Sequence, residues 1–108
     1  MGEEVVIKPS DRLVVVEILQ RFLPLEAQVW AFGSRARGTT KRAADLDLAI
    51  DAGRRLTSSE ECQLEYAFEM SELPYRVDIV DMQTASGVFL ENILRDCIPF
   101  LWNEASHA

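Results

Sequence analysis

The sequence predicts a small α/β domain, in two layers, in which helices pack on one mixed β-sheet. Three short apolar runs, at 28–32, 45–51 and 76–81, have the length of strands. Between and before them, segments 10–23 and 57–73 carry apolar residues at helical spacing. Helices that alternate with strands along the chain are typical of this class. The 108 residues suit one domain with a core.

The charge distribution is uneven. The chain has 18 acidic and 11 basic residues, and its net charge is −7. An acidic surface argues against general binding of nucleic acid, which depends on Lys and Arg contacts to phosphates. Four basic residues nevertheless gather in one short segment, namely Arg35, Arg37, Lys41 and Arg42. A local basic loop on an acidic domain suits a small polyphosphate.

The first expected helix spans most of 10–23. Pro9 and Ser10 read as its start, with Ser10 as the N-cap, and Pro24 ends it. We expect Arg12 to face solvent. The apolar side expected to pack on the sheet consists of Leu13, Val16, Leu19 and Leu23. Residues 1–9 would form a leader, 10–102 the folded domain, and 103–108 a flexible tail.

The run 28–32 reads as a strand covered on both faces, because its apolar residues do not alternate with polar ones. Trp30 and Phe32 would share one face, and we interpret them as core residues rather than a base-stacking platform. Gly33 and Ser34 follow directly. A glycine lets the backbone approach a ligand closely, and a serine hydroxyl can donate to phosphate oxygens.

The residues after Ser34 are expected to open a short helix over 35–37. Its N-terminus would direct unpaired N–H groups and a partial positive charge at phosphate. Arg35 and Arg37 are candidates for direct contact with a triphosphate, since an arginine fork matches phosphate geometry. The alternative interpretation is that these arginines are solvated loop charges without a ligand. This alternative applies more strongly to Arg37 than to Arg35.

The second strand carries the candidate metal ligands. Asp45 and Asp47 lie two residues apart, so on a strand they point to the same side of the sheet. Two ionised carboxylates that face one way repel each other, and a hard divalent cation relieves this. The apolar face would consist of Leu46, Leu48 and Ile50. Asp51 precedes a turn and is interpreted as a turn residue.

The next two elements are a helix and a third strand. Thr57 with Glu60, or Ser58 with Glu61, would form a capping box at the start of the helix. In the run 76–81, an aspartate at 78 lies between apolar neighbours, where it is costly unless paired or bound to metal. Asp78 is therefore the candidate third carboxylate. Asp81, at the end of the strand, competes for this role.

The remaining chain is expected to form a last helix capped by Ser86 and a short extended segment over 98–102. The helix would bury Val88, Phe89, Ile93 and Leu94. Pro99 confines the extended segment to a sheet edge or a turn. Its large residues, Phe100, Leu101 and Trp102, could either close the core or form a partner surface. The single histidine, His107, lies in the tail and offers no basis for a Ser-His-Asp or Cys-His site.

Gly33-Ser34, followed after ten residues by Asp45-x-Asp47, resembles the signature of the nucleotidyltransferase superfamily that includes DNA polymerase beta. In its short length the chain resembles members of the minimal nucleotidyltransferase (MNT) branch of this superfamily. These members often act as the antitoxin paired with a HEPN-domain toxin. The resemblance covers roughly 10–102. One departure is Ala44, where family members often carry a small hydroxyl residue.

The resemblance implies a polymerase beta-like fold and a function. AMP would pass from ATP to a hydroxyl, in these antitoxins a tyrosine of the HEPN toxin. Gly33, Ser34 and Arg35 would hold the outer phosphates, Asp45 and Asp47 would hold two Mg²⁺ ions, and Asp78 would complete the site.

Two other functions remain open at this point. The chain could be a non-catalytic module that neutralises a toxin by covering it, or the nucleotide-binding subunit of a split enzyme that modifies a small molecule. Homo-oligomers are possible in either case. The acidic N-terminus and the lack of an apolar run near 20 residues favour a cytoplasmic protein without a membrane segment.

Overall fold

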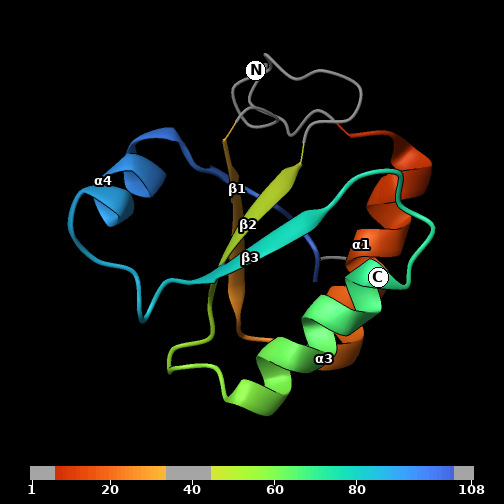
Figure 1. The fold of residues 1–108 in the computed structure, drawn as a ribbon, viewed down its shortest axis with the longest axis horizontal. Coiled ribbons are helices and arrows are strands. Elements are labelled where there is room, and N and C mark those ends of the chain that lie inside the picture. Colours follow the sequence, from red (N-terminus) through yellow and green to blue (C-terminus); the bar gives the residue numbers. More distant parts are fainter. Residues whose placement is uncertain (1–6, 34–44, 104–108) are drawn as a thin grey trace.

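A computed structural model describes residues 7–33 and 45–103. It shows one four-stranded sheet with helices packed on it (Figure 1). The elements in chain order are α1 (Pro9–Phe22), β1 (Gln28–Phe32), β2 (Leu46–Asp51), α3 (Ser58–Glu69), β3 (Val77–Asp81), α4 (Gly87–Asp96) and β4 (Ile98–Pro99). The helix expected at 35–37, residues 1–6 of the leader expected over 1–9, and residues 104–108 of the tail expected over 103–108 lie outside the described residues.

The sheet is mixed, as predicted. Its strand order is β3-β2-β1-β4. β1 runs antiparallel to both β2 and β4, whereas β2 and β3 run parallel. The parallel pair is joined through α3, as a parallel crossover requires. β3 is therefore an edge strand within the described part of the chain.

The main core lies between one face of the sheet and the pair of helices α1 and α3 (Figure 1). Alternate strand residues point into it, which is the period of two expected for strands. The largest fully buried side chains there are Val15, Leu19, Leu46, Leu48, Ile50, Leu64 and Phe100. The predicted α/β class and the predicted apolar face of β2 are confirmed.

The start and the buried side of α1 differ from the expectation. Lys8 is the N-cap and Pro9 is the first helical residue, so Ser10 is not the cap. A proline favours this position because its fixed φ suits the helix and its missing N–H is not needed there. Val15 and Leu19 face the core, whereas Leu13 is 67% exposed. Leu19 and Leu23 are buried and Val16 packs against the core as expected, so the predicted apolar side was wrong only at Leu13, and Val15 is a core residue that it lacked.

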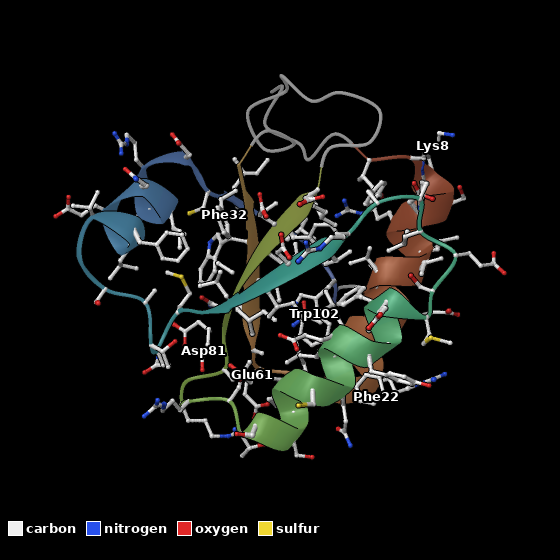
Figure 2. The ribbon with its side chains drawn as sticks, viewed as in Figure 1. Lys8, Phe22, Phe32, Glu61, Asp81 and Trp102 are labelled. Atoms are coloured by element: carbon white, nitrogen blue, oxygen red, sulfur yellow. The ribbon has the colours of Figure 1, made fainter. Side chains whose placement is uncertain are left out.

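The C-terminal segment closes the core against α1. Phe100 and Trp102 are buried, so they are core residues, and the exposed Leu101 lies between them. The guanidinium of Arg12 lies 4.4 Å from the centre of the Phe100 ring and donates to the Leu101 carbonyl at 3.1 Å. Arg12 is partly exposed, so the expectation that it faces solvent holds only in part: its apolar stem and planar head also cover an aromatic ring. Figure 2 shows Trp102 between the sheet and the helices.

Of the two capping boxes predicted for the start of α3, the structure shows the one formed by Thr57 and Glu60. The Thr57 hydroxyl accepts from the Glu60 N–H at 3.0 Å, and the Glu60 carboxylate accepts from the Thr57 N–H at 2.8 Å. Glu60 also receives both terminal nitrogens of Arg54, at 2.8 and 2.9 Å. The Arg54 guanidinium, with the Thr57 N–H as the next contributor, lowers the pKa of Glu60 to about 2.

This pair predicts a pH-dependent contribution to stability. Glu60→Gln keeps the capping box but removes the ion pair, and it should lower the free energy of unfolding at pH 7 by about 0.5–1 kcal/mol, since the pair is partly exposed. Because the folded pKa lies below the ordinary 4.5, the difference should persist above pH 4.5 and vanish as pH falls towards 2. Urea unfolding of both proteins across this range measures it. A difference that stays constant down to pH 2 would contradict the assignment.

The opposite face of the sheet is only partly covered. The side chains of Trp30 and Phe32 are half-buried on this face, whereas Val29 and Ala31 point into the main core. Phe32 meets Phe89 of α4 edge-on, with ring centroids 6.3 Å apart (Figure 2). The expected burial of α4 was largely wrong: Ile93 is buried, but Val88, Phe89 and Leu94 are at least half exposed.

None of the helices in the described part of the chain combines the length and the apolar character that a membrane span needs.

Candidate active site

One row of the sheet brings the chemistry together on its less covered face. In the register, Phe32 of β1 lies opposite Asp47 of β2, and Asp47 lies beside Asp78 of β3. Neighbouring strands are about 4.8 Å apart, so residues paired in this way are direct neighbours. Gly33 follows Phe32 at the same end of β1. The structure therefore places three of the predicted site residues, Gly33, Asp47 and Asp78, at the same end of three neighbouring strands.

Gly33 lies against the carboxylate of Asp47. Its φ is +81°, a conformation that side chains rarely adopt. A Cβ built on Gly33 would overlap Oδ2 of Asp47 and lie 3.4 Å from its Cγ. A residue without a side chain is therefore needed here for two independent reasons, the backbone conformation and the position of Asp47.

Asp78 has a partner that sequence reasoning missed. Arg76 Nη2 lies 3.0 Å from Asp78 Oδ1. The two residues are two positions apart in an extended segment and so share a side of it, which is the signal that would have found the pair. The Arg76 side chain is 79% exposed and that of Asp78 is 38% exposed. An ion pair this exposed is weak, so a divalent cation can displace Arg76 from the carboxylate at little cost.

Asp45 lies at the entrance to β2 rather than within it. The strand starts at Leu46, whose N–H donates to the Arg76 carbonyl at 2.9 Å, and Asp45 is the exposed residue just before it. The predicted strand was one residue too long at this end. The β1–β2 connection thus leaves the sheet at Gly33 and returns at Asp45, both at the end of the strands where Asp47 lies. The predicted site residues Ser34, Arg35 and Arg37 belong to this connection and lie outside the described residues.

Asp81, the alternative candidate for the third carboxylate, has a structural role instead. It lies three residues further along β3, on the core side, and is 4% exposed. Its Oδ2 accepts from the Leu56 N–H at 2.8 Å and its Oδ1 from the Gln83 N–H at 2.9 Å. Figure 2 shows Asp81 beside the loop that leads into α3. Its carboxylate is thus engaged by the backbone of two loops, far from the row of Asp47.

Loss of this carboxylate should be costly for stability. Asp81→Ala would leave two backbone N–H groups without acceptors, one of them buried, and should lower the free energy of unfolding by roughly 2–4 kcal/mol. Asp51 offers a matched control. It accepts from the Gly53 N–H and from Gln83 Nε2, both at 2.9 Å and both exposed, as expected of a turn residue. Asp51→Ala should cost about 1 kcal/mol. Equal losses in urea unfolding would contradict this role of Asp81.

The donor set of the site has the chemistry of a hard-cation site. Asp47 and Asp78 supply carboxylate oxygens on neighbouring strands, and such oxygens are the ligands that Mg²⁺ prefers. Within residues 7–33 and 45–103, however, no three acidic, histidine or cysteine side chains are gathered closely enough to hold a metal ion. Two carboxylates with bound water and phosphate oxygens fit the usual coordination of Mg²⁺, which rarely has an all-protein cage.

The chain belongs to the polymerase beta nucleotidyltransferase family, whose model matches residues 15–102. It is therefore a nucleotidyltransferase, an enzyme class that generally uses a nucleoside triphosphate such as ATP and a divalent metal. The chain is 44% identical over 87 residues to the probable protein adenylyltransferase MntA of Haemophilus influenzae, covering 81% of this chain and 75% of that protein. It is 29% identical over 80 residues to the protein adenylyltransferase MntA of Shewanella oneidensis, covering 74% of this chain and 57% of that protein.

Several solved structures share the fold. A toxin–antitoxin with AMP-PNP matches with a TM-score of 0.71 and 24% identity, covering 89% of this chain and 77% of that one. A complex of the tri-AMPylated HEPN toxin of Shewanella oneidensis with its MNT antitoxin matches with a TM-score of 0.67 and 19% identity, covering 94% and 77%. The predicted fold and the predicted family are confirmed.

Proposed function

We propose that this nucleotidyltransferase moves AMP from ATP onto a hydroxyl of a partner protein, and that the partner is a HEPN-domain toxin which the modification silences. The row that places Asp47 beside Asp78, with Gly33 against Asp47, carries the proposal. Further support comes from two relatives, one named a probable protein adenylyltransferase and the other a protein adenylyltransferase. A protein of similar fold was solved in complex with a tri-AMPylated HEPN toxin, which suggests the partner. We expect the acceptor to be a tyrosine. Both proteins would act in the cytoplasm, where ATP is available.

The residues divide the work between phosphate and acceptor. Gly33, with Ser34, Arg35 and Arg37 beyond the described residues, would hold the outer phosphates. Asp45 and Asp47 would bind two Mg²⁺ ions, and Asp78 would complete the site on the acceptor side. Mg²⁺ held by these carboxylates would lower the pKa of the acceptor hydroxyl and would neutralise charge on the leaving oxygen. Asp47 and Asp78 fix the geometry, because both are held by the register of a parallel strand pair.

The bond changes are those of an in-line displacement. The acceptor oxygen gives its proton to water and forms a bond to the α-phosphorus of ATP. The bond from this phosphorus to the bridging oxygen of the β-phosphate breaks, and pyrophosphate leaves. Positioning and charge neutralisation supply the catalysis, as in other phosphoryl transfers.

The experiment uses the tagged chain with its co-purifying partner, Mg²⁺, and ATP labelled at the α-phosphate. Label should move onto the partner and should be absent with Asp45→Asn/Asp47→Asn. Mass spectrometry of the labelled peptide identifies the acceptor residue. A tight complex without transfer, unchanged by the double substitution, would instead favour a non-catalytic binding module. Transfer to a small molecule only would favour a split small-molecule enzyme.

A further inference from the structure

A groove of about 540 Å³ runs beside the site, between α3 and the outer edge of β3. The lining residues that matter here are Glu65, Phe68 and Glu69 of α3 and Val77, Asp78 and Ile79 of β3. The three β3 residues are consecutive. Since successive side chains of a strand point to opposite faces, a groove that all three line follows the strand edge itself.

The backbone of β3 is available along this edge. The Leu46 N–H donates to the Arg76 carbonyl, and the Met82 N–H donates to the Ile50 carbonyl. In a parallel pair, backbone groups directed at the neighbour alternate along the strand, so those of Val77 and Ile79 point outward. Among the described residues, β3 pairs only with β2. An open strand edge is a template for an added extended chain.

The groove is acidic. Glu65 and Glu69 lie one turn apart on the α3 wall and have no ion pair within the described part of the chain, and Asp78 adds a third carboxylate. Arg76 is the one basic residue of the lining, and Asp78 already pairs with it. Two glutamates therefore remain to attract a basic occupant.

The groove and the active site share Asp78. We infer that the groove holds an extended, basic segment of the acceptor protein, which adds to the edge of β3 and brings the acceptor hydroxyl to Asp78. This inference rests on the proposed function and adds the route by which the acceptor reaches the site. Main-chain pairing would supply affinity, and the glutamates would select the segment and its register.

The test compares two double variants with the same change of net charge. Glu65→Lys/Glu69→Lys should raise the KM for the HEPN partner at least roughly tenfold in transfer from α-labelled ATP, because like charges would face the basic segment. Its kcat and its binding of a fluorescent ATP analogue should change less than about threefold. Glu17→Lys/Glu91→Lys, at exposed positions of α1 and α4 outside the groove, should leave all three quantities near wild type. Equal KM values for the two variants would overturn the inference.

A crosslinking readout separates this inference from the proposed function. A benzoylphenylalanine at Glu69 should crosslink to the partner within the segment that carries the acceptor residue, and one at Glu17 should not. If the wild-type protein transfers no label, the proposed function is wrong. The crosslink alone then shows whether the groove binds a segment of the partner. Crosslinks to a helical or acidic part of the partner, or to none of it, would overturn the inference.

Discussion

Asp47→Asn should lower the rate of AMP transfer by roughly 10³-fold, the loss expected when one preorganised charge-stabilising group is removed. Asp47 is the residue at which the site converges, since it lies beside Asp78, opposite Phe32, and against Gly33. An amide of the same shape preserves these contacts but offers a neutral oxygen to a divalent cation. The measurement is single-turnover transfer of label from α-labelled ATP at saturating Mg²⁺.

Asp51→Asn is the matched control for this substitution. Asp51 lies on the same strand and the same face, four residues further on, but its carboxylate serves a turn through the Gly53 N–H and Gln83 Nε2. An asparagine oxygen can accept these hydrogen bonds, so activity should stay within about threefold of wild type. Comparable rates for Asp47→Asn and Asp51→Asn would exclude Asp47 from the catalytic site. Thermal unfolding of both variants checks that neither loses its fold.

Gly33→Ala should remove most of the activity, roughly 100-fold or more, and destabilise the protein by about 1–2 kcal/mol. The stability loss comes from a side chain forced to a φ of +81°. The activity loss has a separate cause, because the new Cβ overlaps Asp47 Oδ2 and must displace the carboxylate. Displacement of a catalytic group by about 1 Å costs up to about 10²-fold in rate.

Gly53→Ala separates these two causes. Gly53 has a φ of +78°, close to that of Gly33, but an added Cβ there would have nothing within 4 Å. It should show a similar stability loss of about 1–2 kcal/mol with activity near wild type. Guanidinium unfolding and the labelled-ATP assay, run on both variants, measure the two effects. If both alanine variants lose activity equally, the contact of Gly33 with Asp47 has no role in catalysis.

Alternation along the strands predicted much of this structure. Leu46, Leu48 and Ile50 were expected on one face of a strand, and all three are fully buried. The same period of two places Asp78 on the opposite face from Val77 and Ile79, which pack against the core. The capping box of Thr57 and Glu60 was equally local, since four consecutive residues define it. Signals of this kind depend on neighbours in the chain and can be read without the fold.

The contacts between distant segments were beyond such reasoning. The periodicity of β2 and β3 does not determine that they pair in parallel, with Asp47 beside Asp78. The resemblance to a known family implied only that Asp78 completes the site of Asp45 and Asp47. The exposure of Val88, Phe89 and Leu94 shows the same limit. Apolar spacing gives a helix an apolar side, but the spacing carries no information on whether another part of the chain covers that side.

The C-terminal segment has a consequence for how the protein is made on the ribosome. Arg12 and Gln20 of α1 donate to the carbonyls of Leu101 and Trp102, over separations of 89 and 82 residues. Trp102 in turn donates to the Ala27 carbonyl, 75 residues earlier. The first helix can therefore complete its packing only after nearly the whole domain has left the exit tunnel. Contacts of α1 with α3 and the first strands can form earlier, but the hydrogen bonds that tie α1 to the C-terminal segment form last during synthesis.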